Sequence, residues 1–293
     1  MFLFRDGGAL DCAPHYSASG ATATISNGTT AAKKAYVVAN TGALANGPFA
    51  TVKTEADLLA VAGSLMDNTN NVSTQTKTNL WMSGANHVTF NGTNGTAAVT
   101  LSYVAAKIQL IVKDNRTNMS TGTIQIEDKE VVLLFAGKSG KFFGTQKSVQ
   151  TNFYTGDDSY NNPFNTNVTK STALSDAVTV PFAPNAGGTV FNHFYTFGND
   201  GTTQPAILAI KSTKTVNSTP STIYYPVHFT TADAGETIEP GKAYTVTVTL
   251  NGDVEAGAGG GTTDPEAPVI SSSIEVTVTA ATWVVQNIQK EFN

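Results

Sequence analysis

The stretch VISSSIEVTVTAATWVV (269–285), near the end of the chain, decides the class of fold. From position 274 onward, apolar and polar residues alternate. A period of two that is carried by β-branched residues predicts a β-strand with one face buried. The residues expected on the buried face are Ile274, Val276, Val278 and Ala280, and those on the polar face are Glu275, Thr277 and Thr279.

The segment before this strand, NGDVEAGAGGGTTDPEAP (251–268), consists mainly of glycine, acidic residues and proline. Such a composition has little apolar surface to bury and predicts a flexible leash. The pattern alone leaves two alternatives open. The strand at the end of the leash either returns to its own sheet after a long loop, or it is free to pair with another molecule.

The composition indicates a β protein and excludes several classes of function. The chain has 293 residues and a net charge of −5, with 40% hydrophobic but only 13% charged residues, which is about half the charged share of ordinary globular chains. Its polarity comes from Thr, Asn, Ser and Gly, as is typical of secreted β proteins. A mildly acidic chain with scattered Lys and Arg lacks the basic patch that nucleic-acid binding requires. No apolar stretch approaches the roughly 20 residues of a membrane span.

Turn signals separate about a dozen short apolar or alternating runs along the chain, at a spacing typical of β-sandwiches. One helix is predicted after the N-cap Thr54, with Glu55 and Asp57 in its first turn and an apolar face that continues to Leu65. The sequence therefore predicts an all-β protein of two tandem sandwich domains with one short helix in the N-terminal domain. We place the domains at residues 1–103 and 104–293, with a second possible boundary near Gly144.

A search for catalytic or cofactor-binding patterns gives no candidate. The histidines lack partners at zinc-ligand spacing, and no G-x-S-x-G motif is present. Gly257 to Gly261 lacks the flanking strand, helix and Lys-Ser/Thr of a phosphate loop. Asp157 and Asp158 lack the alternating oxygen ligands of a calcium loop. The sequence therefore predicts a protein that is not an enzyme and that binds no cofactor or metal.

Several segments resemble the Bacteroidetes fimbrillins, the FimA-like type V pilins, and they occur in the order of that family. The last segment carries the pattern V-x-V-x-x-x-x-W-V (276–284), which is the most specific feature. The segments are KKAYVVANTGAL (33–44), LWMSG (80–84), VAAKIQLIV (104–112), FYTFGND (194–200), AILAI (206–210), IYYPVHF (223–229), IEPGKAYTVTVTLNG (238–252) and IEVTVTAATWVV (274–285).

This resemblance implies two transthyretin-like, Greek-key sandwiches and export as a lipoprotein to the cell surface. It also implies that an arginine-specific protease removes an N-terminal segment that includes the first strand. The C-terminal strand of a neighbouring subunit then fills the vacated groove, and the resulting fimbria is attached to the outer membrane. Phe2 to Arg5 resembles the first strand after the usual cut, so Arg5 is not expected to be the processing site. Cys12 does not match the lipid-bearing cysteine, so membrane attachment would depend on a lipidated precursor segment that is not seen here.

The implied partners are other fimbrillin subunits and, for adhesion, receptors on host or bacterial surfaces. The stretch 269–293 is the candidate donor strand, and its contact residues would be Ile274, Val276, Val278, Ala280, Trp283 and Val285. The alternative is a tip or accessory adhesin that uses the irregular stretch 144–185. Its contact residues would be Phe153, Tyr154, Tyr160 and Phe164, although the favoured interpretation of these aromatic residues is that they cover an edge of the sandwich. A third class, a secreted hydrolase, would need clustered acids or a catalytic triad.

Overall fold

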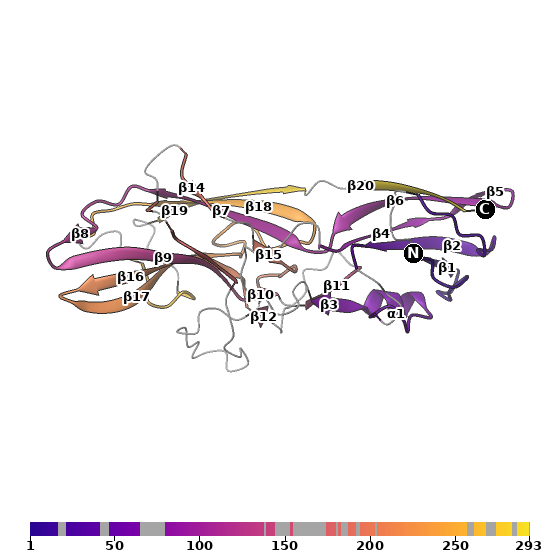
Figure 1. Ribbon diagram of the computed structural model, residues 1–293, viewed down its shortest axis with the longest axis horizontal. Helices are drawn as coiled ribbons and strands as arrows, with labels where there is room; N and C mark the ends of the chain where they lie inside the picture. Colours follow the sequence, from indigo (N-terminus) through magenta and orange to yellow (C-terminus); the bar gives the residue numbers. More distant parts are fainter. Residues whose placement is uncertain are drawn as a thin grey trace.

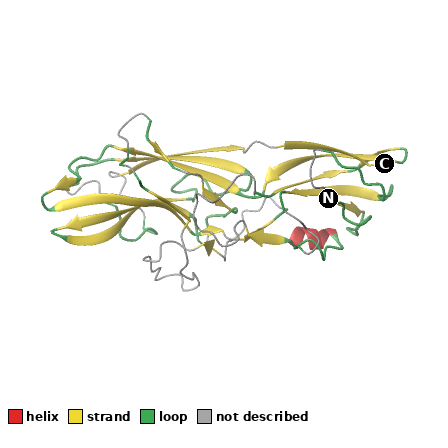
Figure 2. Ribbon diagram, viewed as in Figure 1, coloured by secondary structure: helices red, strands yellow, loops and turns green. Residues whose placement is uncertain are grey.

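The computed structural model describes residues 1–16, 22–41, 47–64, 80–137, 139–143, 153–154, 174–179, 181–182, 187–191, 194–202, 204–256, 261–267, 274–282 and 286–292. These residues form an elongated molecule of β-sheets with one short helix near one end, which confirms the predicted fold class (Figures 1 and 2). None of the helices in the described part of the chain has the length and apolar character that crossing a bilayer requires.

One antiparallel sheet contains the N-terminal strands and has the order β1-β2-β4-β6-β20, with β5 paired to β6. Along β6, inward residues alternate with exposed ones, and Ala97, Val99 and Leu101 are each at most 2% exposed. The strands are β1 (Phe2–Arg5), β2 (Ala32–Ala39), β4 (Met82–His87), β5 (Thr89–Asn91), β6 (Asn94–Tyr103) and β20 (Gln286–Phe292).

The helix α1 (Glu55–Ala60) begins where the sequence predicts it. The Asp57 backbone N–H donates to the Thr54 hydroxyl at 3.1 Å, and the Thr54 N–H donates to the Asp57 carboxylate at 2.9 Å. This reciprocal capping box satisfies two backbone donors that would otherwise lack partners. The predicted apolar face ran on to Leu65, but the helix ends at Ala60. The chain is extended from Val61, and β3 (Ala62–Ser64) pairs with β11 (Ser139–Lys141).

Most of the remaining described strands form two facing sheets. One has the order β13-β9-β16-β17, with β8 paired to β9. The other has the order β14-β7-β18-β19, with β15 also paired to β7. The strands are β7 (Ala106–Asp114), β8 (Ser120–Thr121), β9 (Ile124–Leu134), β13 (Leu174–Ala177), β14 (Thr189–Val190), β15 (Phe194–Thr196), β16 (Ile207–Val216), β17 (Thr219–His228), β18 (Lys242–Leu250) and β19 (Ile274–Thr282), and the short pair β10 (Ala136–Gly137) and β12 (Phe153–Tyr154) lies beside them.

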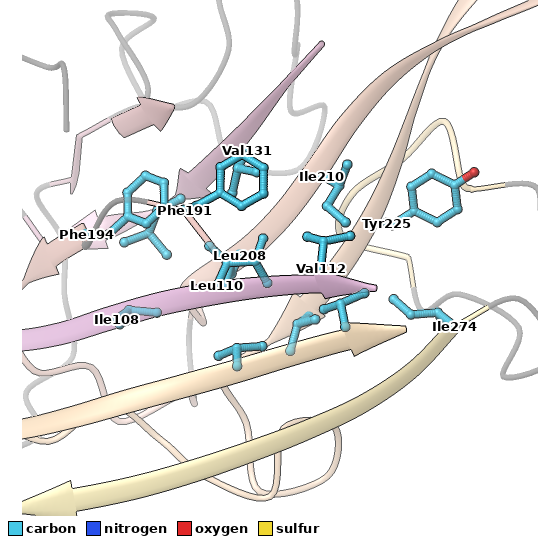
Figure 3. Close-up of a cluster of buried hydrophobic side chains, with 14 of the residues drawn as sticks. Ile108, Leu110, Val112, Val131, Phe191, Phe194, Leu208, Ile210, Tyr225 and Ile274 are labelled. Atoms are coloured by element: carbon cyan, nitrogen blue, oxygen red, sulfur yellow. The ribbon is translucent and has the colours of Figure 1, made fainter. Parts of the chain in front are cut away.

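Both facing sheets contribute to one apolar core (Figure 3). Ile108, Leu110 and Val112 on β7 are fully buried and meet Leu208 and Ile210 on β16. Their alternation along β7 is the period-two pattern of a strand with one face in a core. The two-layer packing accounts for the sandwich that the sequence predicts for this half of the chain.

Residues from the C-terminal part of the sequence also complete the core beside the N-terminal sheet. Phe142 is 2% exposed and stacks on Trp81, with ring centroids 4.4 Å apart. Gly140 in β11 lies so close to Phe197 that a Cβ there would be 2.2 Å from the ring. We propose the domain boundary between the end of β6 and the start of β7, as the sequence suggests. However, β11 and β20 follow this boundary in the sequence but pair with strands of the N-terminal part, β3 and β6. A division of the chain at one position in the sequence does not predict these pairings.

Candidate functional site

The residues predicted to be donated begin in β19, which pairs along its whole length with β18 of its own sheet, from Ile274 opposite Leu250 to Thr282 opposite Lys242. Ile274 is 9% exposed and belongs to the sandwich core. Val276, Val278 and Ala280 are partly buried against the same core. For these four residues the structure shows the first of the two alternatives, a strand returned to its own sheet. Trp283 and Val285 lie outside the described residues.

The chain then continues as β20, which leaves the C-terminal sandwich and pairs with β6 of the N-terminal sheet. The antiparallel register runs from Gln286 opposite Leu101 to Phe292 opposite Gly95. Strands β19 and β20 follow one another along the same long border of the molecule (Figure 1). The sequence pattern does not separate this second strand from the rest of the candidate donor segment 269–293. Its sequence, QNIQKEF, alternates too weakly to be recognised alone.

On the opposite edge of β6, the backbone ladder is incomplete. Strand β4 pairs with β6 only at Met82 and Ser83. Beyond them, Gly84 approaches so closely that a Cβ would lie 2.1 Å from the Thr100 carbonyl oxygen. The Asn86 side-chain amide then donates to the Ala98 carbonyl at 2.5 Å. Because the β4 ladder is short, the seven residue pairs with β20 supply much of the backbone pairing of β6.

The described residues of the 251–268 segment are attached to the C-terminal sandwich and are not the free leash that composition predicts. Val254 is 1% exposed, and its N–H donates to the Thr117 carbonyl at 3.1 Å. Thr262 exchanges two backbone hydrogen bonds with Tyr224, at 2.7 and 2.9 Å. A glycine-rich sequence can therefore be held by its backbone even though it offers few side chains to bury.

His228, at the end of β17, reinforces this attachment. Its Nδ1 lies 2.7 Å from a carboxylate oxygen of Asp233, and its Nε2 lies 3.0 Å from the Pro265 carbonyl oxygen. Burial alone would raise the pKa of Asp233, but the hydrogen bonds from the ring and backbone of His228 lower it below its usual value. The ring thus bridges the loop after β17 and the segment that leads to β19.

Among the residues predicted for an adhesive surface, Phe153 is half-buried in β12. Its ring packs edge-on against Phe135, with centroids 5.8 Å apart. This matches the alternative in which the aromatic residues cover part of the sandwich. Tyr154 follows in β12, while Tyr160 and Phe164 lie outside the described residues. Within the described ranges, no group of three or more His, Cys, Asp or Glu side chains is placed to hold a metal ion.

Comparison with known proteins identifies the class of protein to which this arrangement belongs. Residues 105–283 match the family of the C-terminal domain of FimA-like major fimbrial subunit proteins, and residues 1–128 match the family of the major fimbrial subunit protein FimA. The chain belongs to the FimA-like major fimbrial subunit family. This confirms the resemblance to the fimbrillins, and two family domains agree with a fold of two sandwiches.

Two solved structures show the same likeness. A candidate cell adhesion protein from Bacteroides eggerthii is 70% identical with a TM-score of 0.89, and the match covers 99% of this chain and 89% of that one. Another from Parabacteroides distasonis is 17% identical with a TM-score of 0.53, over 86% of this chain and 84% of that one, and it shows the fold alone. No curated protein sequence gives a significant match.

Proposed function

We propose that this chain is a structural subunit of a fimbria and polymerises by donor-strand exchange. In this proposal, removal of an N-terminal strand by proteolysis prepares the N-terminal sheet of one subunit. The C-terminal strand of the next subunit then pairs with that sheet. The observation that carries the proposal is the pairing of β20 with β6, because the last strand of the chain supplies an edge of the N-terminal sheet.

The contacts that β20 makes within its own chain can be made equally with β6 of another copy. Exchange of an identical element between subunits replaces each contact by the same contact in a neighbour, so it requires little new interface. Without β20, the backbone groups of residues 95–101 on β6 would form an open edge, which is a template for a strand from another chain. A strand of seven residues covers about 23 Å of that edge.

The division of the last two strands suggests which residues are exchanged. Ile274, Val276, Val278 and Ala280 are packed on the core of their own subunit. We propose that these four residues hold the start of the donated segment on its own subunit. Trp283, Val285 and β20 would then form the part that pairs with the neighbouring subunit. The fimbria would lie on the cell surface and attach to the outer membrane through the lipidated precursor segment.

A polymerisation assay tests this proposal. A chain that carries its native upstream segment would be cleaved with an arginine-specific protease and run unboiled on a denaturing gel. A chain that ends at Thr282 keeps β19 and lacks β20. We expect a ladder of polymers from the full chain and none from the shortened one. Equal ladders from both would refute donation by β20.

A pair of substitutions refines the test. Ile288 lies opposite Val99, which is 1% exposed, whereas its neighbour Asn287 lies opposite the exposed Thr100. A new carboxylate beside a buried apolar site is costly. We therefore expect Ile288→Asp to abolish the ladder and the matched control Asn287→Asp to retain it. Loss of the ladder in both variants, or in neither, would contradict the register.

We further propose that the assembled fimbria supports adhesion to surfaces or other cells and that the chain has no enzymatic activity. The 70% identity to the candidate cell adhesion protein from Bacteroides eggerthii supports the adhesive role. The packing of Phe153 against Phe135 favours a shaft role over a tip adhesin that would present this aromatic residue to a receptor.

A further inference from the structure

The outer edge of β19 is a second surface for strand pairing, separate from β20. Strand β19 has nine residues and pairs with β18 in an unbroken register on one side. On its other side it has no partner among the described strands, because it is the last strand of its sheet. It also lies on the outer border of the molecule (Figure 1).

Other edges of the described sheets carry features that discourage pairing with another chain. Strand β17 contains Pro220 and Pro226, and Thr262 already occupies the edge at Tyr224. Strands β1 and β13 have only four residues each, and β8, β14 and β15 are shorter. Strand β20 carries the adjacent charges Lys290 and Glu291. Short strands, prolines, charges and covering segments are the usual means by which proteins protect sheet edges.

Strand β19 has few of these features. Its sequence, IEVTVTAAT, contains no proline, no lysine or arginine, and a single charge at Glu275. Thr277 and Thr279 are exposed, and β-branched residues such as these fit well beside another strand. A regular, nearly uncharged edge of this length is a template for a further strand.

We propose that this edge binds the β19 edge of a second copy of the chain, in an antiparallel and two-fold symmetric pairing. The register with the greatest overlap places Ile274 of each chain opposite Thr282 of the other and pairs all nine residues, over about 30 Å. Val278 then lies on the two-fold axis. The sheets of the two copies would become one continuous sheet across the interface.

The charge pattern of β19 is compatible with pairing between two copies in this register. Glu275 lies opposite Ala281 of the other copy, so no like charges face each other. Symmetric pairing of one patch with itself is the commonest way in which identical chains associate. This contact is lateral, whereas the proposed exchange of β20 joins subunits end to end, so β19 would link neighbouring fimbriae side by side.

Charge substitutions at the two exposed threonines test the pairing and its register. In the proposed dimer, Thr277 of each copy lies opposite Thr279 of the other. The double variant Thr277→Lys/Thr279→Lys therefore places lysine opposite lysine twice. The matched control Thr277→Lys/Thr279→Glu places lysine opposite glutamate twice. Both variants change the same two exposed positions, so circular dichroism should show the wild-type fold for each.

The association would be measured by sedimentation velocity over a range of concentrations, with the full chain in an Ile288→Asp background that removes association through β20. We expect a reversible monomer–dimer equilibrium for this background, retained in the Lys/Glu variant and weakened about tenfold in the Lys/Lys variant. A mixture of the Lys/Lys variant with Thr277→Glu/Thr279→Glu should restore dimers. A chain that stays monomeric at every concentration would overturn the proposal, and so would equal association of the Lys/Lys and Lys/Glu variants.

Discussion

Arg116 is the buried charge whose removal should have the largest effect on stability. Its side chain is fully buried between the two facing sheets of the C-terminal sandwich. The guanidinium donates to both oxygens of Asp114 on β7, at 2.9 and 2.7 Å, and to Asp128 on β9 at 2.7 Å. It also donates to the Tyr225 hydroxyl at 3.1 Å. The arginine is thus the shared partner of two carboxylates that lie on different sheets.

Replacing this arginine leaves both carboxylates without a counter-charge. The side chains of Asp114 and Asp128 are only 10% and 8% exposed, so water cannot fully solvate them. Breaking a buried pair in this way typically costs about 3–5 kcal/mol, because an uncompensated charge stays in the interior. That is a large part of a total stability of roughly 5–15 kcal/mol. We therefore expect Arg116→Met to be severely destabilised.

Urea unfolding followed by circular dichroism measures this loss. The triple variant Arg116→Met/Asp114→Asn/Asp128→Asn is the matched control, because it removes the arginine and the two charges together. We expect the triple variant to be more stable than Arg116→Met alone. The reasoning would be refuted if Arg116→Met unfolded within about 1 kcal/mol of the wild type, or if the triple variant were at least as unstable as the single one.

Three other sites should also contribute measurably to the stability of the fold. Burial alone would raise the pKa of Asp11, but hydrogen bonds from Thr29 and Arg5 lower it below its usual value. The ionised carboxylate therefore stabilises the fold above about pH 4, and this contribution is lost as the pH falls. Asp11→Asn should therefore lower the free energy of unfolding by about 1–3 kcal/mol at pH 7, and by much less in acid, as measured by urea titration at each pH. Phe142→Ala should lower the free energy of unfolding by about 3–5 kcal/mol in the same assay, because the ring is almost fully buried. A loss of stability no larger than that of the exposed control Leu59→Ala would contradict this. Gly84→Ala should cost about 1–3 kcal/mol because its Cβ would meet the neighbouring strand, whereas the control Gly122→Ala, with open space around it, should be near neutral.

Local patterns in the sequence predicted the elements that depend on local interactions. The N-cap Thr54 and the acidic residues Glu55 and Asp57 lie next to one another in the sequence, so the start of the helix could be recognised directly. The alternation from Ile274 likewise identified which residues of β19 turn towards a core. A period of two defines the faces of a strand but not its neighbour, and so the choice between its own sheet and another molecule stayed open.

The features that escaped prediction depend on contacts between distant parts of the chain. The pairing of β3 with β11 and the cluster around Arg116 bring together segments with no shared local pattern. Strand β20 has little apolar character of its own and is defined by its pairing with β6. The 251–268 segment was expected to be a free leash because its composition offers few side chains to bury. It is attached instead through the backbone hydrogen bonds of Thr262, which composition does not predict.

The direction of the β6–β20 ladder has a mechanical consequence. Both strands run along the long axis of the molecule (Figure 1), and the hydrogen bonds of an antiparallel pair are perpendicular to the strands. A pull on the C-terminal strand along this axis therefore loads the seven residue pairs together in shear, rather than opening them one after another. If subunits are joined by this same ladder, a fibre under flow would resist tension with the whole length of each joint, while a sideways peel would separate it pair by pair.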